Sequence, residues 1–234
     1  MKIPLLPDTD VARIGPLTTE QKRVELEVFR LTFPPYRYLP FRKTVGDTVN
    51  ARQGFLPPQA RVPFKNISAN IRAESRNPEE LEANVRVAQG LYDHIEAEGI
   101  EARTHDMRPL ILAGGVKLIF WHSLILIKDS LVTVPFFDPR RSTAKLTPLA
   151  RRFVFSAMNE RLRVLDPDFA EVQLSIYQFA TPKTGPRRPK LYAEDGGALF
   201  TFAELEHMVR ETYDVWTDVY TRRTERERKR SGSI

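Results

Sequence analysis

The densest apolar run of the chain, residues 110–139, constrains the fold more than any other stretch. Successive side chains of a strand point to opposite faces of a sheet, and in this run both faces would be apolar. One face would carry Val116, Leu118, Phe120, Leu124 and Leu126, and the other Ile119, Trp121, Ile125 and Ile127. Such a strand belongs inside a sheet that is covered on both sides. The run therefore predicts strands over 109–113, 116–127 and 131–137, with a tight turn at 128–130.

Capping signals predict the helices around this run. Asn77 as N-cap, Pro78 at the first helical position and Gly99 after the last turn predict a helix over 78–98. Similar signals predict helices near 19–31, from 148 to about 165, and from 202 onward, and alternation predicts a strand over 172–177. Helix, strands, helix and strand in this order predict an α+β fold, in which helices pack on a mainly antiparallel sheet.

Three segments follow from this order. Residues 1–76 would form an extended lead-in, a helix near 19–31 and an arm rich in proline and aromatic residues over 33–64. Residues 77–200 would form the α+β core, including a loop over 181–198. Residues 201–234 would form a long amphipathic helix that ends in a basic tail. On the helix predicted near 19–31, Val24, Val28 and Leu31 recur at the helical spacing of an apolar stripe.

Composition excludes several classes of function. The chain has 234 residues and no cysteine, which excludes disulfides, thiol nucleophiles and thiolate metal sites. Its four histidines, at 94, 105, 122 and 207, lack the spacing of a metal site, and no cofactor motif is present. His122 is expected to be a hydrogen-bonded core residue. Charges and prolines interrupt every apolar stretch before it could span a bilayer or act as a signal peptide. We therefore expect a cytoplasmic protein without a metal, a cofactor or a membrane partner.

The distribution of charge suggests a polyanionic partner. Residues 107–190 carry 14 Lys/Arg against 6 Asp/Glu, a net charge of +8. On a regular helix over 148–165, Arg152, Ser156 and Arg163 would lie opposite the face that packs on the sheet, which would hold Val164 and Leu165. The leading hypothesis is a non-enzymatic subunit that grips the phosphate backbone of DNA or RNA. Its predicted contacts are Arg140, Arg141, Lys145, Arg152 and Arg163, with a second set at Lys183, Arg187, Arg188 and Lys190.

Asp138 is the strongest single candidate for catalysis. It ends a predicted buried strand and precedes Pro139 and two arginines. The order of elements over about 78–180 resembles the restriction-endonuclease-like nuclease core, and this resemblance implies a Mg²⁺ site with a second acid. Glu171 is the candidate for that acid, but Gln173 stands where the family has lysine. The alternative is that Asp138 caps the strand end and pairs with Arg140 or Arg141.

A third hypothesis is a protein-interaction or structural component of a larger assembly. The proline- and aromatic-rich arm over 33–64 and the helix over 202–230 would then contact a partner protein or a second copy of the chain. Segments of the arm's composition can become ordered when they bind.

Overall fold

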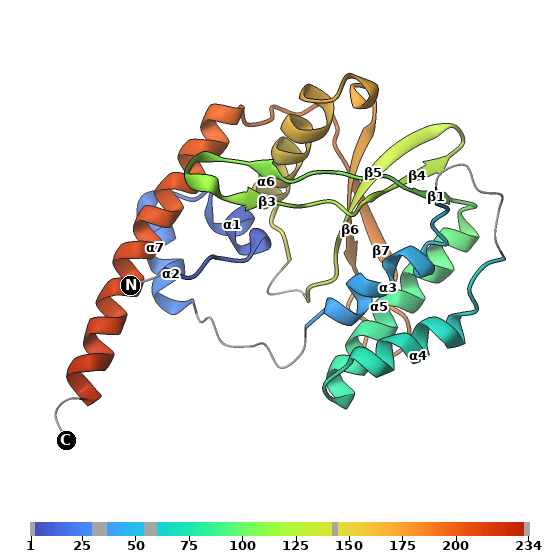
Figure 1. Ribbon diagram of the computed structural model, residues 1–234, viewed down its shortest axis with the longest axis horizontal. Helices are drawn as coiled ribbons and strands as arrows, with labels where there is room; N and C mark the ends of the chain where they lie inside the picture. The colour runs from blue at the N-terminus through green and yellow to red at the C-terminus, as the bar shows by residue number, and fades with distance from the viewer. Residues whose placement is uncertain (1–2, 30–36, 54–59, 142–144, 232–234) are drawn as a thin grey trace.

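The computed structural model of the protein describes residues 3–29, 37–53, 60–141 and 145–231 (Figure 1). Its α-helices are α1 (Asp8–Ile14), α2 (Thr19–Val28), α3 (Leu39–Thr48), α4 (Phe64–Glu74), α5 (Pro78–Ala97), α6 (Pro148–Met158) and α7 (Phe202–Ser231). Its strands are β1 (Glu101–Thr104), β2 (Leu110–Ile111), β3 (Lys117–Leu118), β4 (Leu124–Lys128), β5 (Leu131–Asp138), β6 (Gln173–Phe179) and β7 (Pro189–Ala193). A π-helical segment, Asn159–Val164, continues α6.

Five strands form one mixed sheet in the order β1-β4-β5-β6-β7. Neighbouring strands are antiparallel except β5 and β6, which run parallel and are connected through α6. In the parallel pair Thr133 lies opposite Gln173, and Asp138 lies opposite Gln178. Strands β2 and β3 pair separately as a small second sheet. The prediction of an α+β fold with a mainly antiparallel sheet and a long C-terminal helix is confirmed.

Two hydrophobic cores lie on the two faces of the large sheet. On β5, Val134 and Phe136 belong to the core that also contains residues of α1, α6 and α7. The next residue, Phe137, belongs to the other core, together with residues of α3, α4 and α5. Figure 1 shows α3, α4 and α5 on one side of the sheet and α1, α6 and α7 on the other. The central strands are therefore apolar on both faces because helices cover both of them.

Local capping explains where several helices begin and end. The Asn77 side chain accepts a hydrogen bond from the Glu80 backbone N–H at 2.8 Å, and Thr147 does the same for Ala150 at 3.1 Å. Gly99 follows α5 with a φ of +62°, a conformation that glycine adopts without steric cost. These capping predictions are confirmed, as is the start of α7 at the Thr201–Glu204 capping box.

The predicted strand over 116–127 is broken in the structure. Residues 117–118 form β3, and a new strand, β4, begins at Leu124. The intervening Phe120 and Trp121 are buried in the core with α1, α6 and α7, so the apolar pattern reflects burial rather than one continuous strand. The predicted loop over 181–198 likewise contains an edge strand, β7.

The N-terminal region is more helical than the sequence suggested. The lead-in contains α1, whose Val11 and Ile14 are buried, and the described part of the arm contains α3, whose Phe41 is fully buried. The predicted helix near 19–31 is confirmed as α2, which starts with the Thr18/Gln21 capping box. The apolar residues that suggested it do not face the core: Val24 and Val28 are 60% and 67% exposed, and Leu31 lies outside the described residues. Helix α2 turns Leu26 and the aliphatic part of Lys22 inward instead, because Glu211 on α7 pairs with the Lys22 ammonium.

The π-helical segment changes which residues at the end of the predicted 148–165 helix face the core. A π-helix has more residues per turn than an α-helix, so the 100° spacing does not hold beyond Met158. Val164 and Leu165, expected against the sheet, are 61% and 64% exposed. Ser156, expected on the outer face, lies in α6 before the π-helical segment. It is buried because the chain that leads into α7 covers this face, and its hydroxyl accepts a hydrogen bond from the Phe200 backbone N–H at 2.8 Å. In the part of the chain that the structure describes, no helix is long and apolar enough to span a bilayer.

Candidate functional site

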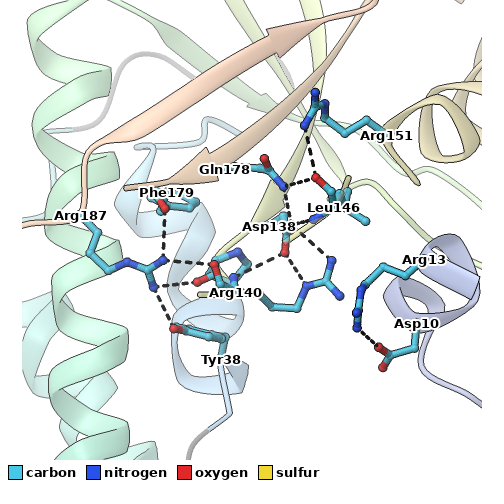
Figure 2. Close-up of polar contacts among 11 residues, drawn as sticks. Asp10, Arg13, Tyr38, Asp138, Arg140, Leu146, Arg151, Gln178, Phe179 and Arg187 are labelled. Atoms are coloured by element: carbon cyan, nitrogen blue, oxygen red, sulfur yellow. Dashed lines mark hydrogen bonds and ion pairs between the residues drawn. The ribbon is translucent and has the colours of Figure 1, made fainter. Parts of the chain in front are cut away.

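Asp138 lies at the carboxyl end of β5, where it organises the loop that leads to α6. It is 1% exposed and forms a bidentate ion pair with Arg140, at 2.7 Å from Nε and 3.3 Å from Nη2 (Figure 2). Its second oxygen also accepts hydrogen bonds from the Leu146 backbone N–H at 3.4 Å and from Gln178 Nε2 at 3.1 Å. These bonds hold together both ends of the 139–146 connection and the neighbouring strand β6. The interpretation of Asp138 as a strand-end cap paired with Arg140 is confirmed.

Arg187 is the second centre of this buried network. It is 2% exposed, although the sequence placed it in a surface loop. Its guanidinium donates to Tyr38 Oη at 2.8 Å and to four backbone carbonyls, those of Ala180, Pro139, Arg140 and Phe179, at 2.8, 2.7, 3.2 and 3.3 Å (Figure 2). Arg187 therefore joins α3, the end of β6 and the loop after β5 from the inside, and it is not a surface phosphate contact.

The geometry does not form a two-acid magnesium site. Strands β5 and β6 are parallel, so Asp138 at the end of β5 faces Gln178 near the end of β6. Glu171 precedes β6 and is exposed, about 23 Å away along the strand by the usual rise per residue. The oxygens of Asp138 are occupied by protein donors. Among the described residues, no three His, Asp or Glu side chains are close enough together to hold a metal ion.

The predicted cationic face is divided among separate internal contacts. Arg163 donates to the Val172 carbonyl at 2.8 Å and pairs with Glu194 at 2.8 Å. Arg152 lies over the Phe200 ring, 3.9 Å from its centroid. With Arg140 paired to Asp138 and Arg187 buried, four of the nine predicted contacts are engaged inside the molecule. The others are half-buried, as Lys145 is, or exposed: Arg141, Lys183, Arg188 and Lys190.

Sequence reasoning missed the neutral members of this network. Gln178 stands between Tyr177 and Phe179 near the end of β6, and a polar residue between two aromatic residues could have marked it as a buried hydrogen-bonding partner. Tyr38 gave no such signal, because its contact with Arg187 spans 149 residues of sequence. His122 was also misjudged: its Nδ1 is buried but has no hydrogen-bond partner among the described residues. Its ring instead packs against Phe137, with centroids 5.0 Å apart.

Comparison with known proteins identifies the family. The model of a family described as "Sliding clamp-binding bacterial toxin SocB" matches residues 9–226, almost the whole chain. The protein belongs to the SocB family. One curated SocB relative, named "DNA replication inhibitor toxin SocB", comes from Caulobacter vibrioides (strain NA1000 / CB15N). It is 32% identical over 229 residues, which cover 98% of this chain and 95% of the relative. No solved structure matches the chain significantly.

Membership of the SocB family corrects the two leading sequence hypotheses. The family description names a protein partner, the sliding clamp, and the Caulobacter relative is named as an inhibitor of DNA replication. Neither name describes nucleic-acid binding or cleavage. The predictions of a phosphate-gripping subunit and of a divergent Mg²⁺-dependent nuclease are therefore wrong. The internal contacts of Arg140, Arg163 and Arg187 explain why these three arginines do not contribute to an open cationic face.

Proposed function

We propose that this protein is a toxin that binds the bacterial sliding clamp and thereby inhibits DNA replication. The observation that carries the proposal is the similarity to the Caulobacter toxin over 98% of the chain. The aligned region includes both hydrophobic cores and every strand of the sheet, so it is not limited to one shared segment. The third hypothesis from the sequence, a protein-interaction component, belongs to the same class of function.

The structure limits which parts of the two predicted contact segments can meet the clamp. In the described part of the 33–64 arm, Phe41 and Val45 of α3 are buried against α5. In α7, the stripe that includes Val209, Trp216 and Val219 is buried in the other core. A partner therefore reaches only the outer faces of these helices and the chain around them.

The C-terminal part of α7 is the more accessible of the two segments. Figure 1 shows it extending past α2 and beyond the rest of the described chain. Its residues 225–229 are exposed and carry both acidic and basic side chains. Exposed charges of this kind affect the rate and specificity of protein association more than its strength. We therefore expect α7 to orient the clamp, while other contacts supply most of the binding energy.

Binding to immobilised Caulobacter sliding clamp, measured by biolayer interferometry, tests the partner. Saturable binding of the full chain is expected, and DNA without the clamp should give no comparable signal. Inhibition is tested by primer extension with a clamp-dependent polymerase and, as a control, with a polymerase that works without a clamp. The protein should slow only the clamp-dependent reaction. Equal inhibition of both reactions, or no binding to the clamp, would contradict the proposal.

Hydrogen–deuterium exchange of the full chain, with and without the clamp, then tests the two contact segments. Protection is expected within 33–64, within 202–230 or in both. Arg226→Glu changes an exposed charge on α7, and Lys183→Glu makes the same charge change in an exposed loop. If α7 orients the clamp, Arg226→Glu should change the association rate more than Lys183→Glu does. Equal association rates for the two variants would contradict the proposal that α7 orients the clamp.

A further inference from the structure

A hollow of about 420 Å³ lies where α1, α3 and the chain between β3 and β4 meet. Its lining includes Asp8 of α1, Arg42 of α3, Phe136 of β5, and Ile119, Trp121 and His122 from the chain between β3 and β4. The volume is within the range of small-molecule sites, which are typically concave and mostly apolar with a few polar groups. The following inference does not depend on clamp binding.

Two polar atoms of the lining residues have no partner in the described residues. Trp121 is 4% exposed, and its indole Nε1–H, which can only donate, meets no acceptor. The buried Nδ1 of the adjacent His122 also has no partner. The indole of Trp216, by contrast, donates to the Pro4 carbonyl at 2.8 Å. Both atoms are almost completely covered by protein, so they lie behind the wall of the hollow and do not contact its contents.

Two side chains of opposite charge, Asp8 and Arg42, also line the hollow and do not form an ion pair with each other. Asp8 accepts a hydrogen bond from the Ile119 backbone N–H at 3.1 Å through one oxygen, which leaves the other available. The Arg42 side chain is exposed and has no hydrogen-bond or ion-pair partner among the described residues, although its charge interacts with that of Asp8. Burial raises the pKa of the half-buried Asp8 carboxyl, so a cationic partner would stabilise its charged form.

The neighbouring charges are already paired, which separates this hollow from the network in Figure 2. Arg140 is held by Asp138, and Arg13 donates to Asp10 at 3.3 Å. Asp8 and Arg42 are therefore the two charged groups left to receive a ligand here. Ile119 and Phe136 supply the apolar part of the lining.

We propose that this hollow binds a small zwitterion of the α-amino-acid type with an apolar side chain. Its carboxylate would accept from Arg42, and its ammonium would donate to Asp8. The Trp121 ring, which lines the hollow, would sense the bound ligand. The apolar side chain would contact Ile119 and Phe136. A ligand with both charges satisfies the two separated charges at once, whereas a simple anion or amine would satisfy one and repel the other.

The chain has two tryptophans, so its indole N–H signals provide a direct test. In a ¹H–¹⁵N spectrum of the full chain, Trp121→Phe assigns the two indole peaks. The probes are individual apolar α-amino acids, with acetate and ethylamine as the two halves of the ligand, each up to about 10 mM. At least one amino acid should shift the Trp121 peak saturably and leave the Trp216 peak in place, at a concentration where acetate and ethylamine have at most a tenth of that effect.

Two variants separate recognition from folding. Arg42→Met keeps the aliphatic part of the side chain and removes the charge, and Asp8→Asn keeps an oxygen for the Ile119 N–H. Both should retain the wild-type pattern of backbone amide peaks while weakening the amino-acid response at least tenfold. Failure of every amino acid to shift the Trp121 peak would overturn the proposal, and so would an equal response to acetate. Unchanged affinity in both variants would also overturn it.

Discussion

Replacing Gly90 with alanine tests the role of the Arg187 loop most directly. Gly90 lies within α5, on the face against which residues 187–188 pack. A Cβ at this position would lie 2.0 Å from the Arg187 carbonyl oxygen and 2.5 Å from its carbonyl carbon. These neighbours are backbone atoms, so a change of side-chain rotamer cannot relieve the overlap. The loop would have to retreat until the oxygen reaches an ordinary contact distance of about 3.4 Å.

The magnitude follows from the contacts that such a retreat would break. The Arg187 backbone N–H donates to the Arg86 carbonyl at 2.8 Å, and its side chain donates to five oxygens. Each hydrogen bond contributes about 1 kcal/mol net, and a buried cation that loses partners costs several times more. Alanine's higher helix propensity offsets about 1 kcal/mol of this loss. We expect the retreat to break about four of these six bonds, so Gly90→Ala should lower the free energy of unfolding by about 3 kcal/mol after the gain in helix propensity.

Urea unfolding followed by circular dichroism measures this difference. Gly46→Ala is the matched control, because Gly46 is also helical but nothing lies within 4 Å of the added Cβ. This control should gain about 0.5–1 kcal/mol from helix propensity alone. In thermal unfolding Gly90→Ala should lower Tm by about 6–12 °C. A Gly90→Ala protein as stable as the wild type would show that the close packing of the Arg187 loop on α5 is not stabilising.

Three further changes test the buried polar groups. Asp138→Asn should lower the free energy of unfolding by about 3 kcal/mol, because Arg140 loses its buried carboxylate partner. Asp168→Asn, at an exposed position, should change it by no more than about 0.5 kcal/mol. Equal urea midpoints for the two variants would contradict this prediction. Arg187→Lys should lower the free energy of unfolding by about 2 kcal/mol, because one ammonium cannot reach all five oxygens that the guanidinium contacts. An unchanged urea midpoint would refute the stabilising role of the guanidinium. Burial, with a smaller contribution from Arg42, lowers the pKa of His122 to about 4. Its unfolded form takes up a proton near pH 6.5 and its folded form does not, so wild-type stability should fall by about 3 kcal/mol between pH 6.5 and 4. His122→Gln should remove this pH-dependent loss of stability. Parallel curves of unfolding free energy against pH for wild type and His122→Gln would contradict the assignment to His122.

Short-range relationships made most of the secondary structure predictable. The N-cap of α5 depends on Asn77 and on a residue three positions later, and its end depends on a single glycine. The turn between β4 and β5 was predicted at 128–130, where Asp129 and Ser130 have positive φ values of 47° and 68°. Such signals act over a few residues, so they can be recognised without knowing the rest of the fold. The break at 119–123 was missed because apolar residues buried in irregular chain give the same pattern as a strand.

The candidate site was less predictable, because the same residue type can serve opposite roles. Arg187 and Lys183 both lie in a basic loop, but one is almost fully buried and the other is exposed. The difference comes from acceptors at residues 38, 139, 140, 179 and 180, which the fold brings together. The hollow beside Trp121 likewise joins residues 8, 42 and 119–122. Charge counts along the chain cannot detect such convergence.

The sequence by itself determined several helices and strands, among them α5, the start of α7 and β5, and that the central strands would be apolar on both faces. These properties depend on residues two to four positions apart, whose relationship the covalent chain sets. Only the tertiary structure decided which arginines are used inside the protein and which polar groups share a hollow. Those outcomes depend on contacts between distant segments, where burial makes an unpaired charge costly and a nearby carbonyl or carboxylate a stabilising partner.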